Sequence, residues 1–286
     1  MGLALRNITA SVVLYGQTLD EVRPLFESLA ADPAVLTWAV VDNGGSMEAM
    51  RFAKTCGALC IEPGRNLGFG AGHNLALRSM SLDAPYHAIL NPDIRMETNV
   101  LTELAVVMDN APDVGLVMPK VSYPDGSIQY LCKLLPTPWD LISRRFGSGA
   151  GKTWLLPRGN DYDMRSFGYD EPVHVPVLSG CFMFLRRATM ELTGGFDERF
   201  FLYMEDTDLC RRLGAISHLL FWPYVSVVHT HTQGSYKSKR LLKLHIQAAM
   251  KYFNKWGWFW DRERAVRNRI GREPAVMTFD SRNTLT

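Results

Sequence analysis

The feature that most restricts the fold is a strand, a helix and a second strand at the start of the chain. The β-branched run 8–15 is typical of a buried strand, and apolar residues at helical spacing follow over positions 19–29. Thr18 and Glu21 have the spacing of a capping box, which marks where the helix begins. A second strand is predicted at 37–41. Because two strands joined by a helix run parallel, this order predicts an α/β fold, a mostly parallel central sheet flanked by helices.

Ligands of such sheets bind at the carboxyl ends of the strands. Asp42 and Asn43 follow the second predicted strand, and another strand, 86–90, is followed by Asn91-Pro92-Asp93. Both segments are also strong turn signals, and a turn is compatible with ligand binding by the same side chains. The sequence therefore places polar candidates at one edge of the sheet.

A glycine-rich segment, 62–77, contains Gly68, Gly70 and Gly72 ahead of a helix predicted from Asn74. Glycines permit close backbone approach to a ligand, and the helix N-terminus could face a phosphate. The alternating glycines do not fit the dinucleotide-binding fingerprint. The segment by itself is equally compatible with a flexible loop at a helix entry.

The stretch 194–212 combines two glycines, an aromatic-rich loop and three carboxylates. Gly194 and Gly195 are suited to ending a helix. The carboxylates, which could serve only as caps of the next predicted helix, are Glu205, Asp206 and Asp208. The aromatic residues, which could wall a carboxylate into a partly dry pocket, are Phe196, Phe200, Phe201 and Tyr203. Such a pocket suits a general base.

This stretch resembles the acceptor-site segment of the family 2 glycosyltransferases of the GT-A fold, which commonly reads Gly-Gly-Phe-Asp-Glu-x-Phe-Phe-x-Tyr-x-Glu-Asp-x-Asp-Leu. Every one of those positions is filled here, and the match is closest to the rhamnosyltransferase-like branch. The resemblance covers roughly 8–235, less closely over 122–171. It implies a GT-A catalytic domain, 1–235, in which the irregular stretch 122–171 lies on the acceptor side.

The resemblance also implies a nucleotide-sugar site. Residues carried over to it, with Asp42 contacting the uracil or thymine, are Tyr15, Asp42, Asn43, Arg65, Asn66, Gly68, Asn74, Asn91 and Asp93. By the same resemblance Asp206 is the catalytic base, which Glu205 and Asp208 orient.

A divalent metal, Mg²⁺ or Mn²⁺, is expected because charge grows on the leaving diphosphate. Asp93 is the candidate ligand, although Asn91 stands where the family often has a first aspartate. A histidine after the strand 221–228 would complete the site, and His229 is preferred over His231. A strand-end histidine is also common as a hydrogen-bonded surface residue.

The segment 236–272 changes in character, with an apolar stripe followed by tryptophans and arginines. A basic helix bordered by tryptophans suits a membrane surface, while a helix docked on the catalytic domain or on a second copy of the chain fits equally well. The tail 273–286 is expected to be disordered. The apolar start of the chain is too short for a membrane span and lacks a secretory cleavage pattern, so we expect a cytoplasmic protein, or one peripheral on the inner face of the plasma membrane.

The resemblance favours an inverting transfer of L-rhamnose from dTDP-rhamnose to a polyprenyl-linked saccharide in bacterial surface polysaccharide synthesis, such as O-antigen or capsule. A UDP-sugar donor and a non-catalytic scaffold of an assembly complex remain alternatives. A glycoside hydrolase is disfavoured, since Asp42, Asn66 and Asp93 indicate a nucleotide pocket. The net charge of +2 argues against a nucleic-acid partner.

Overall fold

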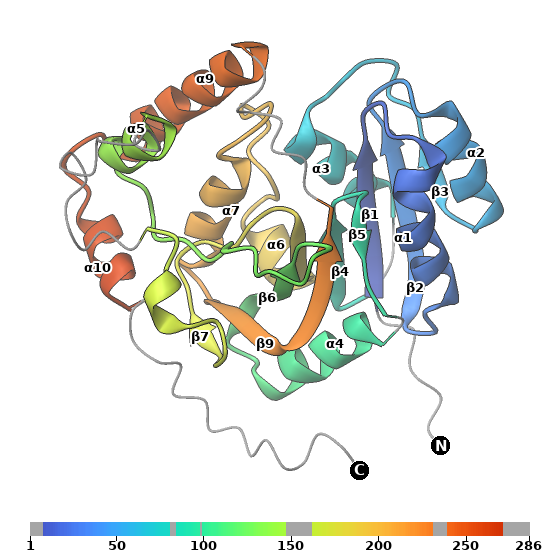
Figure 1. Ribbon diagram of the computed structural model, residues 1–286, viewed down its shortest axis with the longest axis horizontal. Helices are drawn as coiled ribbons and strands as arrows, with labels where there is room; N and C mark the ends of the chain where they lie inside the picture. The colour runs from blue at the N-terminus through green and yellow to red at the C-terminus, as the bar shows by residue number, and fades with distance from the viewer. Residues whose placement is uncertain (1–7, 81–83, 98, 147–161, 231–238, 271–286) are drawn as a thin grey trace.

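The computed structural model describes residues 8–80, 84–97, 99–146, 162–230 and 239–270. Helices flank a large central sheet, as expected of an α/β fold (Figure 1). The strands are β1 Ile8–Leu14, β2 Val35–Asp42, β3 Leu59–Ile61, β4 Tyr86–Leu90, β5 Ile94–Arg95, β6 Val114–Ser122, β7 Val173–His174, β8 Phe182–Arg186 and β9 His218–His229. The helices are α1 Leu19–Ala31, α2 Met47–Thr55, α3 Phe69–Ser79, α4 Val100–Asn110, α5 Pro138–Phe146, the 3₁₀ turn η2 Arg165–Phe167, α6 Arg187–Leu192, α7 Glu205–Leu213, α9 Lys239–Trp256 and α10 Arg262–Ile270.

The sheet is mixed rather than mostly parallel. Its order is β3-β2-β1-β4-β8-β6-β9-β5, and β7 also pairs with β9. The predicted parallel start is confirmed, since β1 pairs in parallel with both β2 and β4. However, β8 runs antiparallel between β4 and β6. A non-strand segment containing Pro176 and Gly180 separates β7 from β8.

The two faces of the first strands are covered by different helices (Figure 1). Val12 of β1 lies in the main core with Phe26 of α1 and Ala49 of α2, whereas the neighbouring Val13 packs in a separate cluster with Ala76 of α3. The alternation follows from the period of two along a strand. The predicted capping box is confirmed, as Glu21 accepts hydrogen bonds from the Thr18 backbone amide and hydroxyl at 2.7 and 2.9 Å.

Helix α3 begins at Phe69, five residues before the predicted start at Asn74. Gly70 and Gly72 therefore lie inside the helix. A Cβ at Gly70 would come 2.7 Å from the Cβ of Phe196, and one at Gly72 would come 2.8 Å from Val13 Cγ2. These two glycines make room for close packing against protein, which corrects the expectation that they allow approach to a ligand.

A buried chain of hydrogen bonds ties β4 and β1, two inner strands of the sheet, to helix α3. His87 contacts the Thr9 hydroxyl through Nδ1 (2.8 Å) and the Ser11 hydroxyl through Nε2 (2.9 Å). Ser11 Oγ also lies 2.7 Å from His73 Nδ1. Burial lowers the pKa of His87 to about 3 and holds the pKa of His73 well below its usual value. Both rings are therefore neutral near pH 7.

Helix α9 packs on the loop before α7, and α10 follows it (Figure 1). Ala248, Tyr252 and Phe253 of α9 are buried against Phe200 and Met204. None of the helices in the described part of the chain combines the length and apolarity needed to cross a bilayer.

Candidate active site

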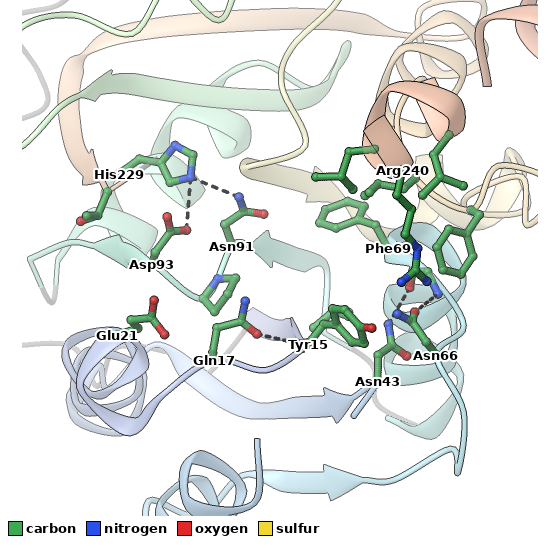
Figure 2. Close-up of a pocket in the computed structure, with 18 of the residues that line it drawn as sticks. Tyr15, Gln17, Glu21, Asn43, Asn66, Phe69, Asn91, Asp93, His229 and Arg240 are labelled. Atoms are coloured by element: carbon green, nitrogen blue, oxygen red, sulfur yellow. Dashed lines mark hydrogen bonds and ion pairs between the residues drawn. The ribbon is translucent and has the colours of Figure 1, made fainter. Parts of the chain in front are cut away.

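A cavity of about 790 Å³ lies at the carboxyl ends of β1, β2 and β4 (Figure 2). Parallel strands that end at one edge bring their following residues together there. The sequence-predicted residues that line the cavity are Tyr15, Asn43, Asn66, Gly68, Asn91, Asp93 and His229. Segments as distant in sequence as β1 and β9 thus share one site.

Asp93 and His229 face each other at one end of this cavity (Figure 2). The antiparallel pairing of β5 with β9 sets Ile94 opposite His229, which places the preceding Asp93 beside the imidazole. Asp93 Oδ1 lies 3.2 Å from His229 Nε2, and Asn91 Nδ2 lies 3.2 Å from the same nitrogen. The His229 side chain is buried, whereas that of Asp93 is 26% exposed. The pair can therefore be reached from the cavity.

Gln129 fixes the imidazole tautomer. Its Nε2 donates to the backbone carbonyl of His229 (2.7 Å), so its Oε1 faces His229 Nδ1 (2.9 Å). We assign an Nδ1 proton to this contact, so Nε2 is the ring nitrogen that faces Asp93 and Asn91. A carboxylate oxygen and an imidazole nitrogen at this separation can bind the same cation.

The donor set fits a divalent metal. An aspartate oxygen and a neutral imidazole nitrogen are ordinary ligands of Mn²⁺ and similar ions. Within the described residues, no group of three or more His, Cys, Asp or Glu side chains is placed to hold a metal. An ion bound by Asp93 and His229 would take its remaining ligands from water and from phosphate oxygens, as Mg²⁺ commonly does.

Asn43 and Asn66 organise the opposite end of the cavity. Asn43 donates through Nδ2 to the Gly68 carbonyl (3.0 Å) and accepts from the Leu67 amide (3.0 Å), and Asn66 Oδ1 accepts from the Gly68 amide (2.8 Å). Gly68 has a φ of +88°, and a Cβ there would lie 2.1 Å from the Phe201 carbonyl oxygen. Glycine is therefore required at this position.

Three predicted nucleotide-site residues are not among those lining the cavity. Asp42 accepts from the backbone amides of Gly44 (2.8 Å) and Ser46 (3.1 Å), so it shapes the turn after β2. Arg65 is exposed on the loop between β3 and α3. Asn74 is buried in α3, where it donates to the Phe196 carbonyl (2.8 Å) and accepts from the Phe196 amide (2.9 Å).

Asp206 lies next to the cavity without lining it. It occupies the first turn of α7, where Oδ2 accepts from the Gly180 amide (3.1 Å) and Oδ1 from the Thr207 amide (2.7 Å). A Cβ at Gly180 would come 3.3 Å from Asp206 Cβ and 3.2 Å from Cε1 of Phe69. Because Phe69 lines the cavity, glycine at position 180 lets Asp206 pack close to the cavity wall.

The two neighbouring acids are buried in protein. Burial, and then the charge of Asp206, raise the pKa of Glu205 well above its usual range. Asp208 is fully buried and accepts from Arg212 Nε (2.8 Å), Lys255 Nζ (2.6 Å) and Trp256 Nε1 (2.8 Å). Its contacts join α7 to α9.

The aromatic residues before α7 have separate surroundings rather than one shared pocket. Phe196 lies in the main core, Phe200 lies beneath α9, and Tyr203 contacts the tilted ring of His245 with ring centroids 4.9 Å apart. Phe201 lines the cavity. The expectation that the four would wall in one carboxylate is therefore corrected.

Sequence reasoning missed Gln129, Phe69 and Arg240. Gln129 lies in the irregular stretch after β6, and no spacing linked it to His229 a hundred residues later. Arg240 was grouped with the C-terminal extension, yet it lines the cavity together with Leu241 and Leu244. The alternative ligand His231 lies outside the described residues.

Comparisons with known proteins agree with this geometry, although no family model matches the chain. The N-acetylglucosaminyl-diphospho-decaprenol L-rhamnosyltransferase of Mycobacterium tuberculosis is 30% identical over 200 residues, 65% of this chain and 63% of the relative. Rhamnosyltransferase WbbL of Escherichia coli K12 is 26% identical over 242 residues, 82% of this chain and 88% of that protein. The match with the mycobacterial relative thus spans less than two thirds of its length.

Among solved structures, a mannosyltransferase from Pyrobaculum calidifontis in complex with GDP-Man and Mn²⁺ superposes with a TM-score of 0.55 at 17% identity, covering 87% of this chain and 64% of that one. At this identity the similarity concerns the fold alone. The chain is thus similar in sequence to rhamnosyltransferases, and it shares the GT-A fold of the glycosyltransferases among its structural neighbours.

Proposed function

We propose that the protein is an inverting glycosyltransferase that moves L-rhamnose from dTDP-rhamnose to a polyprenyl-linked saccharide in bacterial surface polysaccharide synthesis. The observation that carries the proposal is one cavity with the Asp93 and His229 pair at one end, the Asn43 and Asn66 amides at the other, and Asp206 beside it. The names of the two rhamnosyltransferase relatives support the choice of sugar and acceptor.

The nucleotide would lie across the strand ends. Tyr15, whose side chain is 57% exposed at the cavity, offers a ring face for the base. Asn43 and Asn66 would hold the nucleoside from the loop before α3, with Asp42 and Arg65 bordering that loop. Neutral amides pair well with the donors and acceptors of a pyrimidine ring.

Asp93 and His229 would hold a divalent ion, Mg²⁺ or Mn²⁺, against the diphosphate, and Asn91 would steady the imidazole. Such an ion, when bound, offsets the negative charge that develops on the leaving diphosphate. Gln129 occupies Nδ1 of the ring, so that Nε2 is the nitrogen that faces Asp93. The chain's own contribution at this end is therefore to orient two ligands.

Asp206 would act as the general base. Amide groups of Gly180 and Thr207 fix its carboxylate, so it can accept the proton from an acceptor hydroxyl as that oxygen attacks the anomeric carbon. Attack from the face opposite the departing diphosphate forms the new bond and inverts the configuration. Glu205 and Asp208 support α7, the helix that carries this base.

Calorimetric titration of the protein with dTDP and UDP, each with Mn²⁺ and with a chelator, tests the proposal. We expect dTDP to bind more tightly than UDP and Mn²⁺ to strengthen binding. Preference for UDP would change the donor class to a UDP-sugar. Folded protein that binds neither nucleotide would contradict the proposed function and favour the scaffold alternative.

We also propose that the turn between α9 and α10 contacts a membrane surface. Phe259 and Trp260 are 78% and 95% exposed there. Arg264 and Arg267 do not face outward as cations for lipid, since Arg264 donates to the Pro136 carbonyl and Arg267 pairs with Glu263. The candidate contact is thus centred on the aromatic turn, and Arg262 and Arg269 are the exposed cations of α10.

Vesicle flotation measures this contact directly. Replacing both Phe259 and Trp260 by serine should reduce recovery with vesicles that contain anionic lipid. Tyr224→Ser changes another exposed aromatic residue, on β9, and serves as the control. Unchanged flotation of the double variant, or no flotation of the unaltered protein, would contradict a membrane contact at this turn.

A further inference from the structure

Arg95 and Asp93 line the cavity from one short segment of the chain, two positions apart. Ile94, between them, is fully buried, whereas Arg95 is exposed. This alternation is what an extended strand imposes, because successive side chains point to opposite faces. Directly after Arg95, the Met96 carbonyl accepts a hydrogen bond from Ser28 of α1 (3.0 Å). A cation is thus held on the same side of the segment as a candidate metal ligand.

The pairing of β5 with β9 keeps Arg95 close to His229. In this antiparallel pair Ile94 lies opposite His229, and Arg95 lies opposite Val228. A strand rises about 3.4 Å per residue, so the Cα atoms of Asp93 and Arg95 are about 7 Å apart. An arginine carries its charge at the end of a long aliphatic stem, which can bridge such a spacing. The Arg95 guanidinium can therefore reach an anion bound at the Asp93 and His229 pair.

The charges that line the cavity leave Arg95 available to a ligand. The described lining residues that carry charge at neutral pH are Asp20, Glu21, Asp93, Arg95 and Arg240. Arg240 belongs to the nucleoside end (Figure 2). The Glu21 carboxylate accepts from the amide and the hydroxyl of Thr18. Within the described part of the chain, no ion pair or hydrogen bond engages the Arg95 side chain.

We propose that Arg95 binds the diphosphate of the donor nucleotide. This inference rests on the proposed function and deepens it, because that function places the diphosphate at the Asp93 and His229 end. A guanidinium presents N–H donors in a planar fork that matches phosphate oxygens. Its charge adds to that of a divalent ion in offsetting the carboxylates of Glu21 and Asp93, and it complements the negative charge that develops on the leaving diphosphate.

The test compares dTDP with thymidine, which lacks the phosphates. Binding of dTDP is measured by calorimetry with Mn²⁺, and the weaker complexes, dTDP with a chelator and thymidine, by ligand-observed NMR. Arg95→Gln should weaken dTDP binding about tenfold or more in Mn²⁺ and in chelator alike, and leave thymidine binding unchanged. Arg95→Lys, which keeps the charge without the fork, should bind dTDP with intermediate affinity. No acceptor is present, so the phosphates of a lipid-linked acceptor cannot account for the result.

Arg51→Gln is the matched control, because Arg51 of α2 is an exposed arginine that does not line the cavity. It should bind both ligands like the unaltered protein. The inference is wrong, while the proposed function stands, if Arg95→Gln binds dTDP with unchanged affinity or loses dTDP and thymidine binding equally. A loss seen in Mn²⁺ but not in chelator would also overturn it, since Arg95 would then act through the metal. Failure of the unaltered protein to bind either dTDP or UDP would overturn the proposed function and the inference together.

Discussion

Asp93 and Asp208 are two carboxylates with different surroundings. Asp93 follows the carboxyl end of β4, faces His229 at 3.2 Å and lines the cavity. Asp208 lies in the first turn of α7, fully buried, with donors from Arg212, Lys255 and Trp256 around it. The comparison teaches that a carboxylate surrounded by protein donors holds elements together, whereas one with a face on a cavity is available to a ligand.

Asp206→Asn gives the largest expected change within the α7 cluster. Loss of the proposed general base should lower the rate of transfer by about 100- to 10,000-fold, because the amide cannot accept the acceptor's proton. The rate is measured with dTDP-rhamnose and an N-acetylglucosaminyl-diphospho-polyprenol acceptor. Binding of dTDP, measured by calorimetry, should stay within about twofold, as Asp206 does not line the cavity. Full activity in this variant would refute the assignment.

Asp208→Asn, two residues away, should instead reduce stability. Removing one charge from a buried ionic cluster leaves Arg212 and Lys255 less well compensated, which typically costs about 3–5 kcal/mol. Denaturant unfolding measures the loss. Thr207 lies between the two acids, and Thr207→Ser is a mild control on the same turn. Unfolding that matches that of the unaltered chain would mean that Asp208 does not secure α9.

Asp93→Asn tests the cavity end of the comparison. We expect dTDP affinity in Mn²⁺ to fall about tenfold, toward the value in chelator, because the remaining imidazole and amides hold a divalent ion poorly. The free energy of unfolding should change much less than in Asp208→Asn. Retained metal dependence of dTDP binding would show that Asp93 is not a ligand.

The smallest effect concerns acid. Arg199, and then Lys255, hold the pKa of Asp197 below its usual range. A lowered native pKa contributes stability above the unfolded pKa of about 3.9, and this contribution is lost as pH falls toward the native pKa. Between pH 5 and 3, the free energy of unfolding should therefore fall further in the unaltered protein than in Asp197→Asn. The extra loss should be at most about 1 kcal/mol. Denaturant unfolding at each pH measures the difference. If the free energy of unfolding falls in parallel in the two proteins, the ion pairs of Asp197 do not contribute to stability in this pH range.

Local sequence patterns predicted the early strands and helices well. The β-branched run of β1, the capping box at Thr18 and the positive-φ glycines 194 and 195 depend on neighbours within a few positions. The strand-end pattern and the family resemblance together led to one cavity, which Asp93, His229 and Asn66 line. The roles of these residues stay predictions until nucleotide and metal binding are measured.

Long-range contacts could not be predicted in this way. Gln129 lies a hundred residues from His229, and Arg240 lies in a helix for which composition favoured a membrane surface and docking on the catalytic domain equally. Gly70 and Gly72 have the spacing of a ligand loop but pack against Phe196 and Val13. In each case, the deciding partner comes from a segment that no local period connects to the residue.

The sequence by itself determined the order of the early elements, the chemical groups at the strand ends and the helix that begins at Glu205. Only the tertiary structure decided that β8 runs antiparallel inside the sheet, that Asp208 binds α9 and that Arg240 enters the cavity. The physical reason is the distance along the chain over which each kind of interaction acts. Propensity, capping and periodicity act between near neighbours, whereas burial and hydrogen bonding are satisfied by whichever distant segment the packed chain brings into contact.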